Sequence, residues 1–187
     1  MAKTLVCTIE EEAILNYLFV KEMYSEGDTL LLVSQFKFAP QVERYKTLFK
    51  DVNIESIVLA KDGDEDLWDT ICRTIRAALS PDKQYAVNLS SGSRLMSIAV
   101  QQVFERFNSQ FYFMPHDRNV IIHSQIDDNN DNNDDQVTPI KYQVSVDEYF
   151  NINDIHCVAA NPLAPSKAQP NVWKNLQKRP SRTKITR

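Results

Sequence analysis

The stretch with the clearest chemical character is YAVNLSSGSRLM, residues 85–96. A hydrophobic run is followed by Ser90–Ser93, which surround Gly92, and then by Arg94. Small residues let a backbone approach a ligand closely, and the free amides at the start of a following helix form a partly positive site. Serine hydroxyls add hydrogen-bond donors, and Arg94 adds a fixed positive charge. This pattern is typical of a loop that binds a phosphodiester.

The same residue types have a simpler interpretation. Serine and glycine also build ordinary turns, and Ser93 has the place of an N-cap for the helix that follows it. Neither GxGxxG nor GxxxxGK[ST] occurs in the chain, so the usual dinucleotide and P-loop fingerprints are absent.

Strands and helices that would position this loop alternate along the first two thirds of the chain. Short Val, Leu and Ile-rich runs predict strands, and apolar residues at helical spacing predict the helices between them. This alternation predicts an α/β fold: a Rossmann-like, mostly parallel sheet with helices on both faces. The expected strands are 3–9, 28–35, 53–60, 84–90 and 110–116, and the expected helices are 11–27, 39–51, 64–79 and 93–107.

The pattern changes near residue 118. Residues 118–126 and 137–146 are predicted to pair as a C-terminal antiparallel β-hairpin, and the acidic run 127–136 would form its tip. This tip starts like a calcium loop, with acidic or amide residues at alternating positions. However, Asn132 stands where the glycine belongs and Thr138 stands where the bidentate glutamate belongs, so a mobile solvated loop is expected instead.

We expect one domain over residues 1–150. Residues 151–187 contain four prolines and finish with basic residues, without periodicity, so they are interpreted as an extended basic tail or linker.

Composition narrows the class of protein. The chain has 187 residues, 43% hydrophobic and 25% charged, as in an ordinary globular protein. A net charge of −4 argues against a protein whose whole surface binds duplex nucleic acid. No apolar run approaches the roughly 20 residues of a membrane helix, so we expect a cytoplasmic protein without membrane association. Cys7, Cys72 and Cys157 are far apart and lack CxxC spacing, which predicts buried single thiols and no metal site.

Ligands of open α/β sheets lie beyond the carboxyl ends of the strands, where the strand order reverses. If the sheet has the common 3-2-1-4 order, residues 8–12 and 90–94 face each other at that edge. Glu10, Glu11 and Glu12 crowd the first of these segments, and they also favour a helix N-terminus by themselves.

The segment NLSSGSRLMSIAV, together with the order of elements over residues 3–150, is similar to a known family. It resembles the N-x-[ST]-G-G-[ST]-[KR]-x-M-x-x-A motif of CRISPR-associated Rossmann-fold (CARF) domains, the sensors of cyclic oligoadenylate in type III CRISPR immunity. It looks most like the branch in which this domain precedes a restriction-type nuclease or another effector.

The resemblance implies a homodimer with a symmetric pocket across its interface, which suits a cyclic ligand built of identical repeats. The expected ligand is cyclic oligoadenylate, with cyclic tetra-adenylate as the leading ring, and no cofactor or metal is expected. An effector domain or effector protein is the expected partner.

The resemblance also assigns roles to residues. Asn88 would brace the loop, Ser90–Ser93 would contact ribose and phosphate, and Arg94 would face the ring. Thr8–Glu10 would form the opposite wall. The full expected ligand-contacting set is Thr8, Ile9, Glu10, Asn88, Ser90, Ser91, Gly92, Ser93, Arg94, Met96 and His116.

Two other hypotheses remain open at this point. Some CARF domains cleave their own ligand without metal, by in-line attack of a ribose 2′-hydroxyl. A ring nuclease of this kind would use Ser91, Arg94 and Thr8, and His116 has a weaker claim as a general base than as a turn residue. The other hypothesis is a Rossmann-like regulatory domain for a different nucleotide.

Overall fold

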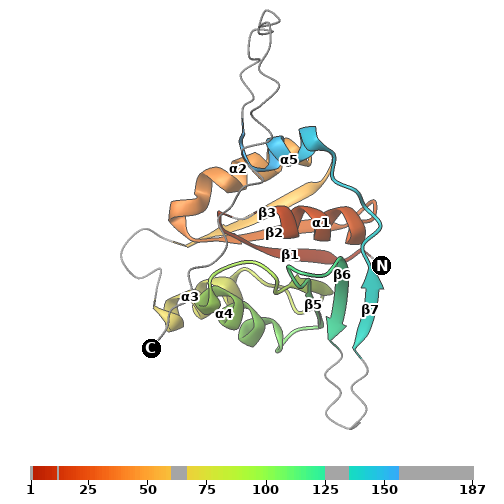
Figure 1. The fold of residues 1–187 in the computed structure, drawn as a ribbon. Coiled ribbons are helices and arrows are strands. Elements are labelled where there is room, and N and C mark those ends of the chain that lie inside the picture. The colour runs from red at the N-terminus through yellow and green to blue at the C-terminus, as the bar shows by residue number, and fades with distance from the viewer. Residues whose placement is uncertain (1, 12, 60–66, 125–134, 156–187) are drawn as a thin grey trace, which may run out of the picture. The chain divides into compact units, whose positions relative to one another are not determined.

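Seven strands form one sheet in the order β3-β2-β1-β4-β5-β6-β7 in the computed structural model, which describes residues 2–11, 13–59, 67–124 and 135–155 (Figure 1). The strands are β1 (Thr4–Ile9), β2 (Thr29–Ser34), β3 (Asn53–Val58), β4 (Tyr85–Asn88), β5 (Ser109–Phe113), β6 (Val120–Ser124) and β7 (Gln136–Pro139). The first five are parallel, whereas β6 and β7 run antiparallel. The sheet therefore has the common 3-2-1-4 order, and the predicted terminal hairpin is confirmed.

Burial explains why the central strands are so apolar. Every residue of β1 and β4 is buried, because helices cover both faces of these strands. The outermost strand β7 is exposed throughout. The centre of the sheet is thus fully buried, and it ends at the edge where the candidate loop begins.

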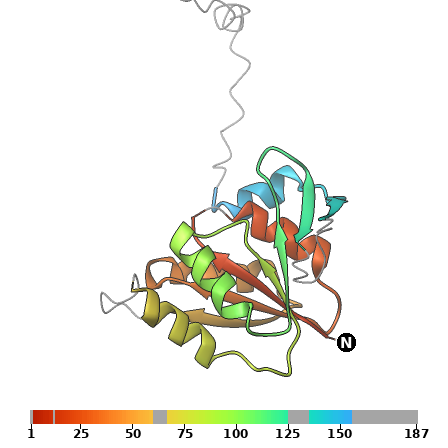
Figure 2. The same cartoon turned by 90° about the horizontal axis from the view of Figure 1, so that it is seen from below.

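Helices cover both faces, as predicted. On one face lie α1 (Ile14–Met23), α2 (Ala39–Leu48), which follows the 3₁₀ turn η1 (Phe36–Phe38), and the short α5 (Val146–Ile152). On the other face lie α3 (Trp68–Ala77) and α4 (Arg94–Phe104), side by side in Figure 2. None of the helices described here has the length and apolar character needed to cross a bilayer.

Some predicted boundaries differ from the structure. The first helix ends at Met23 instead of Gly27, because Tyr24 is extended and the next residues form a separate turn. In that turn the amide of Asp28 donates to the carbonyl of Ser25, and Gly27 has a φ of +90°. The acidic tip with its candidate calcium positions, up to residue 134, and residues 156–187 of the predicted tail lie outside the described residues.

The last described helix is held against α1 by one carboxylate. Glu148 takes part in a capping box with Ser145, and its side chain also accepts hydrogen bonds from the hydroxyls of Tyr142 and Tyr17, the latter at 2.8 Å. These bonds, led by the one from Tyr142, lower the pKa of Glu148 to about 2. An ion pair of 2.6 Å between Arg44 and Asp154 ties α2 to the residues just after α5.

Candidate functional site

The loops after β1 and β4 contact each other directly. Thr8 Oγ1 donates a hydrogen bond to the carbonyl oxygen of Ser91, and Ser91 Oγ lies 3.1 Å from the carbonyl oxygen of Thr8. Neighbouring strands lie only about 4.8 Å apart, so side chains of this size fill the space between their ends. Thr8 is 1% exposed and Ser91 is 9% exposed. These two hydroxyls therefore face each other, inside the protein, and form a floor.

Asn16 completes this floor from α1. Its Nδ2 donates to the carbonyl oxygen of Thr8 at 2.7 Å. Its Oδ1 accepts from Ser91 Oγ at 2.6 Å and from Asn88 Nδ2 at 2.9 Å. Asn16 is fully buried, and a buried amide is stable only when its donors and acceptors are satisfied. The set of predicted site residues omitted Asn16, although an asparagine between Leu15 and Tyr17 on an apolar helix was a signal.

Asn88 braces the loop that follows β4. Its Oδ1 accepts from the amide of Ser90 at 3.0 Å and from Ser90 Oγ at 2.6 Å. Ser90 Oγ in turn accepts from the amide of Met114 at 2.6 Å. Since Met114 follows β5, the hydroxyl of Ser90 joins the ends of β4 and β5.

Gly92 passes over Thr8 in a conformation that requires glycine. Its φ is +100°, and a Cβ at this position would lie 2.5 Å from Thr8 Oγ1 and 2.9 Å from Thr8 Cβ. No real Cβ tolerates such distances, and the left-handed backbone adds strain for other residues. At Gly92 the loop therefore has no side chain that could keep a ligand from its backbone.

Ser93 and Arg94 begin α4. The Oγ of Ser93 accepts from the amide of Met96 at 3.3 Å, so the N-cap interpretation of Ser93 is confirmed. Arg94 is the first helical residue and its side chain is exposed. Arg94 therefore adds a positive charge to the N-terminal end of α4, where the helix dipole is also positive.

The remaining predicted residues differ in how far they are buried. Ile9 is buried and Glu10 is half-buried after β1. Met96 is 2% exposed and packs in the core together with Ala99 and Val100. His116 is exposed in the turn between β5 and β6. The structure thus gathers Thr8, Asn88, Ser90, Ser91, Gly92 and Ser93 around one edge. The amide of Met96 contacts Ser93, but its side chain points into the core.

The two described cysteines are buried. Cys7 and Cys72 are free and buried, as predicted, and burial raises the pKa of both thiols. Cys157 lies outside the described residues. Within the described ranges, no group of three or more His, Cys, Asp or Glu side chains is placed to hold a metal ion.

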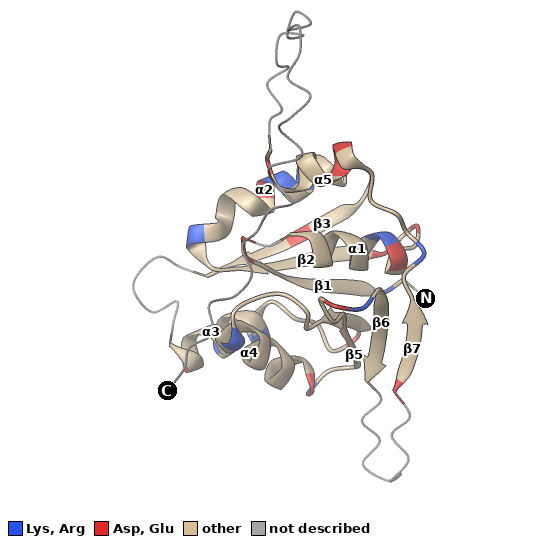
Figure 3. Ribbon diagram, in the orientation of Figure 1, with Lys and Arg blue, Asp and Glu red and all other residues tan. Residues whose placement is uncertain are grey.

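Basic and acidic residues are mixed over the visible helices and strand ends in Figure 3.

Comparison of the sequence with protein families gives one match over this domain. The family model described as the Card1 CARF domain matches residues 4–149. None of the curated proteins matches the chain.

Solved structures with a similar fold include two with little sequence identity. The structure of Can2 from Sulfobacillus thermosulfidooxidans in complex with cyclic tetra-adenylate has a TM-score of 0.61 and 12% identity, and the match covers 80% of this chain and 40% of that one. Protein VC1899 from Vibrio cholerae has a TM-score of 0.67 and 10% identity, with 80% of this chain and 39% of that one covered. The chain therefore spans about two fifths of the length of these structures.

Proposed function

Because the chain belongs to the Card1 CARF domain family, we propose that it binds cyclic oligoadenylate as a sensor in type III CRISPR defence. The proposed site is the edge where the loops after β1 and β4 meet. The observation that carries the proposal is the exposed Arg94 at the start of α4, two residues after Gly92, which has no side chain to block the approach of a ligand.

The contacts divide the predicted residues into two roles. Thr8, Asn88, Ser90 and Ser91, with Asn16, use their polar side chains on one another and so position the loop. Gly92, Ser93 and Arg94 are then the groups that meet a phosphodiester, through backbone, hydroxyl and guanidinium. A guanidinium at a helix N-terminus combines two sources of attraction for phosphate.

The opposite wall is acidic, and this suits the bases of the ligand. Glu10 is half-buried directly after β1. A carboxylate repels phosphate but accepts hydrogen bonds from the exocyclic amino groups of adenine. Glu10 therefore favours an orientation in which the phosphates lie on the side of Arg94.

We propose a homodimer as the binding form, because a ring of identical nucleotides presents the same groups to each of two protomers related by a two-fold axis. Can2, which shares the fold, holds cyclic tetra-adenylate in its solved structure, and this supports the four-membered ring as the first ligand to test. Since the chain covers only 40% of Can2, an effector domain or effector protein is proposed to act on the bound state.

Binding without cleavage is the function that the geometry supports best. The ring-nuclease hypothesis needs Thr8, Ser91 and Arg94 to face the scissile phosphate. The hydroxyls of Thr8 and Ser91 are buried against each other, and of the three only Arg94 is exposed.

The test is a thermal-shift titration with cyclic tri-, tetra- and hexa-adenylate beside AMP and ATP. One ring is expected to raise the melting temperature, as any ligand that binds only the folded state does. Arg94→Ala should weaken binding by about 10- to 100-fold, the effect of losing a charged hydrogen bond, while Arg73→Ala on the exposed side of α3 should not. No shift with any ring would refute the proposal and leave the fold unaffected. Chromatography of the same samples should show intact ring, and linear products would restore the nuclease hypothesis.

A further inference from the structure

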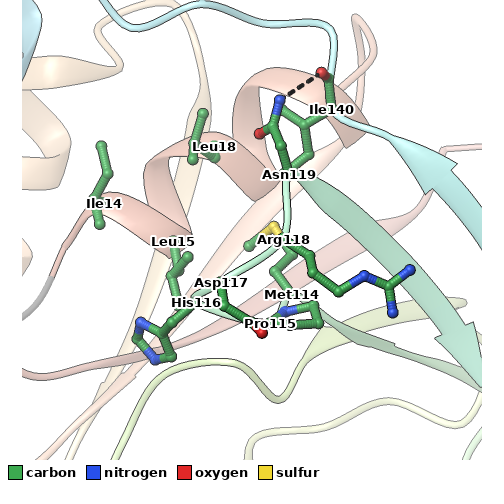
Figure 4. Close-up of a pocket in the computed structure, with 10 residues that line it drawn as sticks. All are labelled: Ile14, Leu15, Leu18, Met114, Pro115, His116, Asp117, Arg118, Asn119 and Ile140. Carbon is green, nitrogen blue, oxygen red and sulfur yellow. Dashed lines mark hydrogen bonds between the residues drawn. The ribbon is translucent and has the colours of Figure 1, made fainter.

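A cavity of about 510 Å³ lies between α2 and β3, the outermost strand of the sheet. It is two strands away from β1 and shares no residue with the proposed ring site. A different cavity, drawn in Figure 4, has Met114 and Arg118 in its lining and adjoins that site, because the amide of Met114 donates to Ser90 Oγ. The cavity beside β3 therefore needs an explanation of its own.

The walls of this cavity are mainly apolar. Val42 is buried, and Ala39 and Pro40 belong to the first turn of α2. Phe36 of η1 and Val58 of β3 also line the cavity, and they are 43% and 37% exposed. A ligand with an apolar side chain would remove these two surfaces from water and gain the free energy of their burial.

The outer edge of β3 is open to a further strand. Within the described residues β3 pairs only with β2. The amide of Leu59 donates to the carbonyl of Ser34 at 2.8 Å, so the peptide groups of Leu59 point to β2. Peptide groups alternate in direction along a strand, and those of Ser56 and Val58 therefore point to the open edge. Since the same two residues line the cavity, a strand added to β3 would lie beside it.

Charged groups lie at two levels of this β3–α2 groove. Lys37 is exposed just before α2, and its ammonium lies 4.9 Å from the centre of the Phe38 ring. Glu43 comes four residues after Ala39, about 6 Å further along the helix axis. Two residues of an extended strand span about 6.6 Å, and their side chains lie on the same face. One added strand would therefore reach both charges, and the hydroxyl of Ser56 completes the polar part of the lining.

We propose that the β3–α2 groove binds the carboxyl-terminal segment of a partner protein as an added parallel strand. The terminal carboxylate lies against Lys37 and the positive end of α2, and the apolar side chain of the last residue fills the cavity. A basic residue two positions earlier lies near Glu43, whose carboxylate is also contacted by Lys46 at 2.6 Å. The expected segment thus ends in a basic residue, any residue and an apolar residue. This inference does not depend on ring binding.

The first experiment titrates the 187-residue chain with a short fluorescent peptide that ends in lysine, threonine and leucine and has a free carboxylate. Fluorescence anisotropy should show saturable binding. The same peptide with an amidated terminus should bind at least about 10-fold more weakly, as expected when a charged hydrogen bond is lost. Glutamate in place of the lysine should weaken binding by about 2- to 5-fold, because an exposed ion pair contributes little.

Hydrogen exchange tests the strand addition itself. The bound peptide should slow exchange of the Ser56 and Val58 amides at least about 10-fold, because the added strand accepts hydrogen bonds from them. The amide of Ile57 points to β2 by the same alternation, so its exchange should stay unchanged.

A matched pair of variants tests the charge at the end of the groove. Lys37 and Lys50 are both exposed, but only Lys37 lines the cavity. Lys37→Glu should weaken binding of the free-carboxylate peptide at least about 10-fold, whereas Lys50→Glu should leave it unchanged. Ser56→Pro removes an amide donor from the open edge, where a strand tolerates proline, and should abolish binding. If Ser56→Pro fails to fold, hydrogen exchange of the unmodified chain decides.

The outcomes separate the parts of the proposal. If peptides that end in leucine, valine or phenylalanine all fail to bind, the proposal is wrong. If amidation and Lys37→Glu have no effect while Ser56 and Val58 are protected, the groove takes internal segments and the role of the terminal carboxylate is wrong. If a peptide binds without protecting these two amides, the strand addition is wrong.

Discussion

Thr8 and Ser91, 83 residues apart in the chain, are joined at the ends of β1 and β4 by a hydrogen bond from the hydroxyl of Thr8 to the carbonyl of Ser91. Thr8 and Ser91 were both expected to contact a ligand, but they contact each other and so hold the loop that carries Gly92. Gly92 passes close to Thr8, and this requires that both loops stay in these positions. The groups proposed to contact the ligand are therefore the more exposed ones that follow, Gly92, Ser93 and Arg94.

Gly92→Ala should destabilise the fold by more than about 2 kcal/mol, because the new Cβ would meet Thr8 in a backbone region that already disfavours alanine. Gly27→Ala is the matched control: its φ is also positive, but nothing lies within 4 Å of the added Cβ. It should cost about 1 kcal/mol, from backbone strain alone. Urea unfolding of both variants measures the difference, and equal costs would mean that the close approach to Thr8 is absent.

Asn16→Ala should cost about 2–4 kcal/mol, because it leaves the Thr8 carbonyl, the Asn88 amide and the Ser91 hydroxyl without their buried partner. It should also weaken ring binding, since the loop after β4 loses its support. Asn108→Ala, at an exposed position, provides the control and should change the free energy of unfolding by less than about 0.5 kcal/mol. A stable Asn16 variant with full ring affinity would refute the supporting role.

Attachment of α5 should weaken in acid. The pKa of Glu148 falls from its ordinary 4.5 to about 2 in the folded chain, so its carboxylate stabilises the fold fully above pH 4.5. That contribution is lost as the pH falls from 4.5 towards 2. Hydrogen exchange of the Tyr149 amide, bonded to the Ser145 carbonyl, should accelerate in this range beyond the intrinsic pH effect.

Removing the hydroxyl of Tyr142 tests whether its hydrogen bond lowers the pKa of Glu148. Tyr142→Phe should move the loss of protection to higher pH, because the hydrogen bond from Tyr142 is the largest contribution to the lowered pKa. Tyr24→Phe is the control, since the described residues offer its hydroxyl no hydrogen bond. An unchanged pH profile in the Tyr142 variant would assign the effect to other groups.

Thiol reagents should leave Cys7 and Cys72 unmodified in the folded chain at pH 8, because burial raises the pKa of both and blocks access. Both should react once the chain is unfolded in urea. Mass spectrometry of alkylated peptides provides the measurement, and rapid modification of Cys7 without urea would show that β1 is not covered.

The sequence predicted the sheet because its signals are local and repeated. Apolar runs of strand length alternate with helical spacing, and this predicts parallel crossovers with helices on both faces. The meeting of the loops after β1 and β4 follows once the common 3-2-1-4 strand order is assumed. The N-cap role of Ser93 was equally local, since it depends on an amide three residues away.

Side-chain direction at the site could not be predicted in the same way. Whether Ser91 faces a ligand or Thr8 depends on a residue 83 positions away, and the role of Asn16 depends on both. Met96 had two interpretations in the sequence, a ligand contact from its place in the motif and a core residue from its helical spacing to Val100, and the structure shows it packed with Val100 in the core.

The position of β1 has a consequence for how the chain is made. β1 lies between β2 and β4, so one of its hydrogen-bonding edges stays unpaired until Tyr85–Asn88 has left the ribosome. Val6 and Cys7, both fully buried in the finished sheet, remain accessible during that interval. An apolar strand with an open edge is prone to pair with other chains. Nascent chains that end before β4 should therefore depend most on chaperones. The pairing of β4 with β1 covers that edge and also brings the loops after the two strands into contact.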